Sequence, residues 1–120
     1  MSAARNRSDL TWEVYSDVVP CLQRWREEEI ELGVISNFDS RLYQVLQTLD
    51  LKQYFSSVTI SSEVGAAKPD LKIFQSAIAH YQVSPEETWH IGDSQREDYE
   101  AAKAMGMQGF LLKRKSLVLR

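Results

Sequence analysis

Two spacings of apolar residues alternate along the chain. Some apolar residues follow one another in short unbroken runs, which is typical of buried β-strands. Others recur three or four positions apart, as Leu42, Val45, Leu46 and Leu49 do, which is typical of a helix with one buried face. The pattern predicts strands at residues 32–36, 58–60, 88–91 and 109–112.

Helices are predicted between these strands, and a few residues mark where they begin and end. Asp39 can cap one helix, Pro69 can start the next, and residues 84–87 have the spacing of a capping box around a single turn. Gly65 lies in the loop before Pro69, and Gly106 stops the last helix. The predicted helices cover residues 17–31 and 96–105 and the segments 42–49 and 71–81.

The alternation of short apolar strands with helices predicts the fold class. Parallel strands need connections of helix length, and helices on both faces bury such strands completely. We therefore expect an α/β domain with a doubly wound, Rossmann-like parallel sheet. In such sheets ligands bind beyond the carboxyl ends of the strands, so residues that directly follow a strand are the first candidates for a site.

Composition and charge exclude several classes of protein. With 120 residues, 43% of them hydrophobic and 26% charged, the chain resembles one globular domain. A net charge of −3 gives no reason to expect nucleic acid or membrane partners. No apolar run approaches the roughly 20 residues that span a bilayer. Residues 1–8 lack the apolar core of a secretion signal, and Cys21 has no second cysteine to pair with. These features predict a soluble, cytoplasmic protein.

The polar ends of the chain set the expected domain boundaries. Residues 1–11 are predicted to be frayed or disordered. Residues 114–120 are predicted to form a solvated tail, and the basic cluster at 113–115 lies where this tail begins. Residues 12–113 then form the core domain.

Ser36 and Asn37 directly follow the first predicted strand. A hydroxyl, an amide and free backbone N–H groups at a strand end suit the oxygens of a phosphate group. The alternative is an ordinary turn, in which both residue types are common.

Lys68 precedes Pro69 at the start of a predicted helix. A cation in this position opposes the helix dipole, so an anionic ligand would explain its presence. The alternative is a solvated lysine.

Asp93 and Asp98 lie at the end of the third predicted strand and on the helix after it. Asp98 shares a helix face with Ala102, so its carboxylate is expected to point inward. Two carboxylates that converge there make a hard oxygen site that suits Mg²⁺. The alternative is that they cap the helix and complement its dipole. His90 is interpreted as a strand histidine rather than a catalytic base.

Taken in this order, segments 32–37, 63–70 and 90–107 resemble three motifs of the haloacid dehalogenase-like (HAD) hydrolase superfamily. Most members are Mg²⁺-dependent phosphatases that form an aspartyl-phosphate. The resemblance covers about residues 12–113. It implies a small phosphorylated metabolite as substrate and Mg²⁺ as cofactor. It further implies that Ser36, Asn37 and Lys68 bind the phosphoryl group, with Lys68 neutralising its charge, and that Asp93 and Asp98 hold the metal.

The motif that carries the family's nucleophile is missing. It has the form Asp-x-Asp, and no two of the seven aspartates of this chain are two residues apart. The resemblance therefore implies a truncated core that lacks both its central first strand and the cap domain. Such a core is expected to be inactive alone. Without that strand the sheet is expected to fall into two two-stranded pieces, whose exposed edges favour association.

Other functions remain open. The chain could be a non-catalytic remnant that binds phosphate or Mg²⁺, or the partner of a second chain that supplies the Asp-x-Asp. A response-regulator receiver domain has a similar size and also contains a Lys-Pro pair. In receivers the acidic cluster precedes that pair, whereas here Lys68 precedes Asp93, and the order argues against this reading.

Overall fold

The computed structural model describes residues 4–5, 12–13 and 16–112. The first two of these segments, β1 (Ala4–Arg5) and β2 (Trp12–Glu13), pair in antiparallel orientation. The rest of the start for which fraying was predicted, and the tail predicted at 114–120, lie outside the described residues. Within the described part of the chain, every helix is too short or too polar to cross a membrane.

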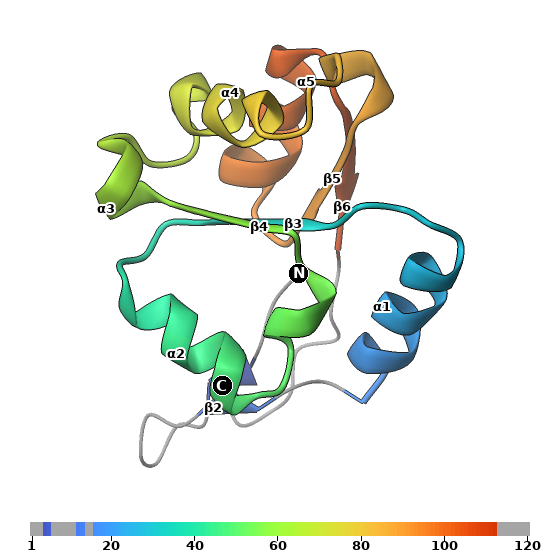
Figure 1. The fold of residues 1–120 in the computed structure, drawn as a ribbon. Coiled ribbons are helices and arrows are strands. Elements are labelled where there is room, and N and C mark those ends of the chain that lie inside the picture. The colour runs from blue at the N-terminus through green and yellow to red at the C-terminus, as the bar shows by residue number, and fades with distance from the viewer. Residues whose placement is uncertain (1–3, 6–11, 14–15, 113–120) are drawn as a thin grey trace.

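Strands and helices alternate through the remainder of the chain, and each of the four predicted strands is present to within one residue at either end (Figure 1). The elements are α1 (Val18–Glu27), β3 (Gly33–Ser36), α2 (Arg41–Thr48), η1 (Lys52–Tyr54), β4 (Ser57–Ile60), α3 (Ser61–Val64), α4 (Leu71–Ala79), η2 (Pro85–Glu87), β5 (Trp89–Gly92), η3 (Gln95–Glu100), α5 (Ala101–Met105) and β6 (Gln108–Leu111).

Some helix boundaries differ from the predicted ones for local reasons. Helix α1 ends at Glu27 rather than near residue 31, because Glu29 has a left-handed backbone with φ 63°. Helix α4 begins at Leu71 rather than at Pro69, because Asp70 is extended and accepts a hydrogen bond from the Lys72 amide at 2.9 Å. The capping box predicted at residues 84–87 is present at η2.

The strands pair in parallel, as predicted. Val34 of β3 lies opposite Val58 of β4, and His90 of β5 lies opposite Gly109 of β6. The two pairs do not join into one sheet: among the described residues, β3–β4 and β5–β6 are separate two-stranded sheets. The architecture is therefore mixed α/β with parallel strands, divided into two pieces as the missing first motif led us to expect.

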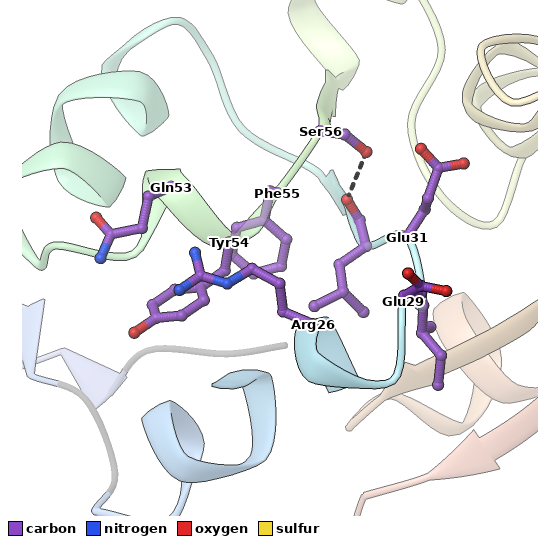
Figure 2. A pocket seen from close by; sticks show the side chains of 9 residues that line it. Arg26, Glu29, Glu31, Gln53, Tyr54, Phe55 and Ser56 are labelled. Carbon is purple, nitrogen blue, oxygen red and sulfur yellow. Dashed lines mark hydrogen bonds between the residues drawn. The ribbon is translucent and has the colours of Figure 1, made fainter. Parts of the chain in front are cut away.

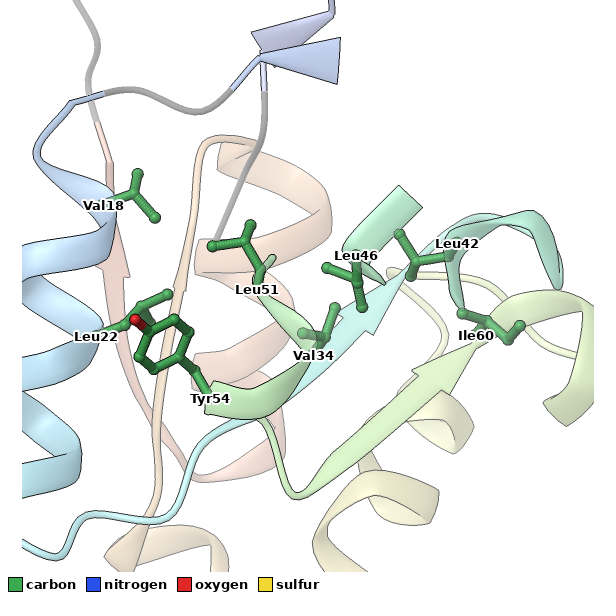
Figure 3. Packing of buried hydrophobic residues seen from close by; sticks show 8 residues of the cluster. All are labelled: Val18, Leu22, Val34, Leu42, Leu46, Leu51, Tyr54 and Ile60. Atoms are coloured by element: carbon green, nitrogen blue, oxygen red, sulfur yellow. The ribbon is translucent and has the colours of Figure 1, made fainter. Parts of the chain in front are cut away.

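Helices cover both faces of β3–β4, with α1 and α2 on one side and α4 and α5 on the other (Figure 1). The period of two along β3 explains this, because Val34 packs in one core cluster and Ile35 against the other. The cluster on the α1 and α2 side is drawn in Figure 3 and consists of Val18, Leu22, Val34, Leu42, Leu46, Leu51, Tyr54 and Ile60. The cluster on the α4 and α5 side consists of Ile73, Phe74, Ala101, Ala102 and Met107.

A cavity of about 920 Å³ lies between the two sheets. Its walls include Val34 and Ile35 from β3 and Ile91 from β5, with Leu22 from α1 and Met107 from the segment before β6. Polar residues line both ends of the cavity, and those at the carboxyl ends of β3 and β5 include Ser36, Asn37, Lys68, Asp93 and Asp98.

The β3 edge that faces this cavity predicts association. Within the described residues β3 pairs with β4 alone, so the backbone of its other edge can accept a strand from another molecule. We expect the average mass in sedimentation or light scattering to rise with concentration, and thermal unfolding to occur below about 65 °C. A clean monomer at all concentrations that melts cooperatively above this temperature would contradict the prediction.

Candidate functional site

The residues that follow β3 and β5 line the same cavity. Asn37, one residue after β3, holds the main chain of Lys68 at two points: its Oδ1 accepts from the Lys68 amide at 2.7 Å, and its Nδ2 donates to the Lys68 carbonyl at 3.0 Å. A residue 31 positions away in sequence is thereby fixed at the end of β3.

The Lys68 side chain crosses from the end of β3 to η3. Its Nζ donates to Asp98 Oδ1 at 2.6 Å, with 12% of the lysine side chain and 5% of the aspartate side chain exposed. Two opposite charges so far from water are stable only when further hydrogen bonds compensate for the lost hydration. Asp98 has such bonds.

Three donors surround the Asp98 carboxylate. Its Oδ1 accepts from Lys68 and from His90 Nε2 at 2.9 Å, and its Oδ2 accepts from the Ser94 amide at 3.1 Å. The π-helical turn η3 places Asp98 over the end of β5, because the Tyr99 amide donates to the Ser94 carbonyl five residues earlier. The prediction that Asp98 points inward is confirmed, since the residue is 4% exposed.

Gly92 makes room for this carboxylate. A Cβ atom at position 92 would overlap the Asp98 side chain, so any residue other than glycine would force Asp98 to move. His90 and Gly92 stand two residues apart on β5 and therefore face the same side of the strand, toward Asp98.

The groups that surround Asp98 stabilise its ionised form. Burial raises the pKa of this carboxyl, but the hydrogen bonds from His90, Lys68 and the Ser94 amide outweigh burial and hold the pKa well below its ordinary value. Asp98 is therefore an anion across the physiological range, and an anionic carboxylate can only accept hydrogen bonds.

All five residues predicted for the site line the cavity. Ser36 is half-buried at the last position of β3, and Asp93 is exposed directly after β5. Among the described residues no three His, Cys, Asp or Glu side chains gather closely enough to enclose a metal ion. Mg²⁺ needs only one or two carboxylates because it keeps several waters. Asp93 fits such a ligand, and Asp98 retains one oxygen lone pair beyond its three hydrogen bonds.

The contact between His90 and Asp98 was not foreseen from the sequence. The residues are eight positions apart, on a strand and on a π-helical turn, and neither period brings them together. The one available signal was the period of two on β5, which places His90 on the face that Gly92 leaves open.

A second hollow, of about 300 Å³, lies at the opposite ends of the strands (Figure 2). Arg26 stacks on the Tyr54 ring at 4.7 Å, and the Ser56 hydroxyl donates to the Leu32 carbonyl at 3.2 Å. None of the residues predicted for the site lines it. It precedes β3 and β4, and the carboxyl end of the strands is where α/β sheets bind ligands.

Replacing Gly92 with alanine should displace Asp98. We expect the free energy of unfolding, measured by urea denaturation, to fall by about 1–3 kcal/mol, which is the usual cost of overpacking. Gly65→Ala is the matched control, because a Cβ at this position meets nothing within 4 Å. Only the left-handed φ of 82° disfavours alanine there, and this should lower the free energy of unfolding by roughly 1 kcal/mol. A clearly smaller destabilisation by Gly92→Ala than by Gly65→Ala would show that Asp98 does not occupy this space.

Acid should weaken the fold through Asp98. Because its folded pKa lies below the unfolded one, its stabilisation is complete above the ordinary aspartate pKa of about 3.9 and is lost as the pH falls toward the folded value. Asp98→Asn removes this component, so its unfolding free energy should vary less between pH 6 and pH 3 than that of the unsubstituted chain. Parallel profiles for the two proteins would refute the assignment.

Comparison with known proteins identifies the family. Residues 3–106 match the model of the haloacid dehalogenase-like hydrolases. The haloacid dehalogenase-like hydrolase domain-containing protein 3 of Bos taurus is 40% identical over 105 residues, which are 88% of this chain and 42% of that protein. The glyceraldehyde 3-phosphate phosphatase of Methanopyrus kandleri is 36% identical over 94 residues, 78% of this chain and 40% of that protein. The chain thus spans less than half the length of these relatives.

Solved structures agree with the sequence comparison. A HAD phosphatase from Thermococcus onnurineus superposes with a TM-score of 0.84 at 32% identity, over 87% of this chain and 48% of that one. The HAD-hydrolase YfnB of Bacillus subtilis, solved bound to magnesium, has the same fold with a TM-score of 0.74 at 22% identity, over 81% of this chain and 44% of that one. The chain belongs to the haloacid dehalogenase-like hydrolase superfamily.

Proposed function

We propose that this chain forms the phosphate- and magnesium-binding part of a phosphate-ester hydrolase. The observation that supports this most is the position of Lys68, whose ammonium group is held beside Asp98 at the carboxyl ends of the strands. A fixed cation at this place can neutralise a phosphoryl group as charge develops on it. Ser36 contributes a hydroxyl at the same end of the cavity.

Each predicted residue has a distinct part in the proposal. Ser36 and Lys68 contact the phosphoryl oxygens, and Asn37 contributes to phosphate binding mainly by holding the Lys68 main chain, because both ends of its amide are already engaged there. Asp93 binds Mg²⁺, and Asp98 holds it directly or through water. Bound Mg²⁺ would supply charge neutralisation at the phosphate oxygens.

The nucleophile has to come from outside this sequence, since the 120 residues contain no Asp-x-Asp. The relatives are more than twice as long as the part that they share with this chain. We propose that an extended apolar segment ending in Asp-x-Asp enters the cavity beside β3, either from a longer form of the protein or from a second chain. The family's central first strand would supply such a segment, which would unite the two sheets into one doubly wound sheet.

The proposed substrate is a small phosphorylated metabolite, acted on in the cytoplasm through an aspartyl-phosphate. The activity named for the Methanopyrus kandleri relative, on a three-carbon sugar phosphate, supports this class. A non-catalytic phosphate- or magnesium-binding role is the second candidate, and the lack of an Asp-x-Asp favours it for the 120 residues alone.

The proposal predicts magnesium binding without turnover. The chain should bind Mg²⁺ weakly in calorimetric titration, and Asp93→Asn should reduce the affinity at least tenfold because the exposed ligand is lost. Asp70→Asn is the matched control, because asparagine caps a helix as well as aspartate does. Hydrolysis of an aryl phosphate should be undetectable, since the loss of a nucleophile costs roughly 10⁶ in rate. Turnover that disappears in Asp93→Asn, or equal Mg²⁺ affinity in all three proteins, would disprove the proposal.

A further inference from the structure

His90 is a partly buried polar residue that the proposed chemistry does not use. It lies on β5 with 11% of its side chain exposed, and its Nε2 is 2.9 Å from Asp98 Oδ1. A histidine that only filled space on a strand would not need to aim a ring nitrogen at a carboxylate.

The surroundings of His90 fix the direction in which its ring points. Phe74 of α4 is fully buried and meets the imidazole edge-on, with ring centroids 5.0 Å apart and an angle of 84° between the planes. Edge-to-face contact is a favoured geometry for two rings, so packing against Phe74 keeps the imidazole oriented toward Asp98. The missing side chain at Gly92 leaves the approach to the carboxylate clear.

The other hydrogen bonds of Asp98 indicate which atom carries the hydrogen between His90 and Asp98. Both oxygens of Asp98 already accept hydrogen bonds, one from the Lys68 ammonium group and the other from the Ser94 amide, so we take the carboxylate as the acceptor from His90 as well, with the hydrogen on Nε2. His90 is therefore a donor to the same oxygen, Oδ1, that accepts from Lys68.

We propose that His90 is a positioning residue for Lys68, which it controls through the Asp98 carboxylate. The inference rests on the proposed role of Lys68 at the phosphate site. The long lysine side chain has four flexible bonds and stays in place only if its acceptor does. The Ser94 amide holds the other oxygen, Oδ2, and a carboxylate held at one oxygen alone can turn about its Cβ–Cγ bond. His90 supplies the second anchor, which prevents that rotation.

Two substitutions separate this role from simple packing. His90→Phe keeps an aromatic ring against Phe74 but removes the donor, and His90→Gln restores an N–H at a similar reach. His80→Gln is the matched control, because it changes the other histidine of the chain, which is exposed at the end of α4. Circular dichroism establishes that each variant folds.

The decisive measurement is the rate at which the Lys68 ammonium protons exchange with water, followed by ¹⁵N NMR at constant pH. In the unsubstituted chain and in His80→Gln these protons should exchange slowly, because Nζ donates to Asp98 and only 12% of the lysine side chain is exposed. Exchange should accelerate several-fold in His90→Phe and return toward the original rate in His90→Gln. Equal rates in all four proteins, or no recovery in His90→Gln, would overturn the proposal.

A second measurement needs no variant and applies even if His90→Phe fails to fold. The ¹⁵N spectrum of the imidazole in the unsubstituted chain should show the proton on Nε2. A ring protonated only on Nδ1 would overturn the proposal, because such a ring cannot donate to Asp98.

Titration with Mg²⁺ alone connects the inference to the site and keeps the two hypotheses distinguishable. We expect His90→Phe to weaken Mg²⁺ binding about tenfold, the lower end for loss of a group that orients a ligand, and His90→Gln to recover most of it. If the unsubstituted chain binds no Mg²⁺, the proposed function fails, while the proton exchange of Lys68 still decides the role of His90.

Discussion

The buried contact between Lys68 and Asp98 is the interaction on which the site depends. Burying two charges costs more than their attraction returns unless the remaining hydrogen-bonding capacity is satisfied. The Ser94 amide and His90 meet that requirement for the carboxylate, and the absence of a side chain at Gly92 gives the carboxylate its space. Removing either partner of such a pair costs about 3–5 kcal/mol, because the other charge is then left buried without compensation.

The same contact links two parts of the molecule that share no sheet. Asn37 fastens the Lys68 main chain to the end of β3, and the Lys68 side chain reaches Asp98 beside β5. In addition to these hydrogen bonds, Ile73 and Phe74 of α4 pack in a hydrophobic core that also includes residues of α5. A hydrophobic layer on one face and a chain of hydrogen bonds at the strand ends thus hold the two sheets around a cavity of about 920 Å³.

In the proposed function, this arrangement separates two requirements of phosphoryl chemistry. The cation and the acids that suit phosphate and magnesium are organised by residues within this chain, independently of a nucleophile. The 120 residues contain no Asp-x-Asp, and the relatives are much longer than the part that they share with this chain. Under the proposed function, electrostatic stabilisation and nucleophilic attack come from different segments, and a segment that enters the cavity would meet a site whose charges are already in place.

The sequence predicts four parallel strands, the main helices between them and the family, because apolar periodicity and short motifs are local properties, but it did not predict the short elements η1 and α3. It also placed Ser36, Lys68 and Asp93 near strand ends, since residues that follow parallel strands meet at one edge. The contacts between these groups could be seen only in the folded structure: Asn37 forms two hydrogen bonds with the Lys68 main chain, and His90 donates to Asp98. Such contacts join residues far apart in sequence, and their geometry depends on how α4 and η3 pack on the strands, a relation that no local pattern encodes.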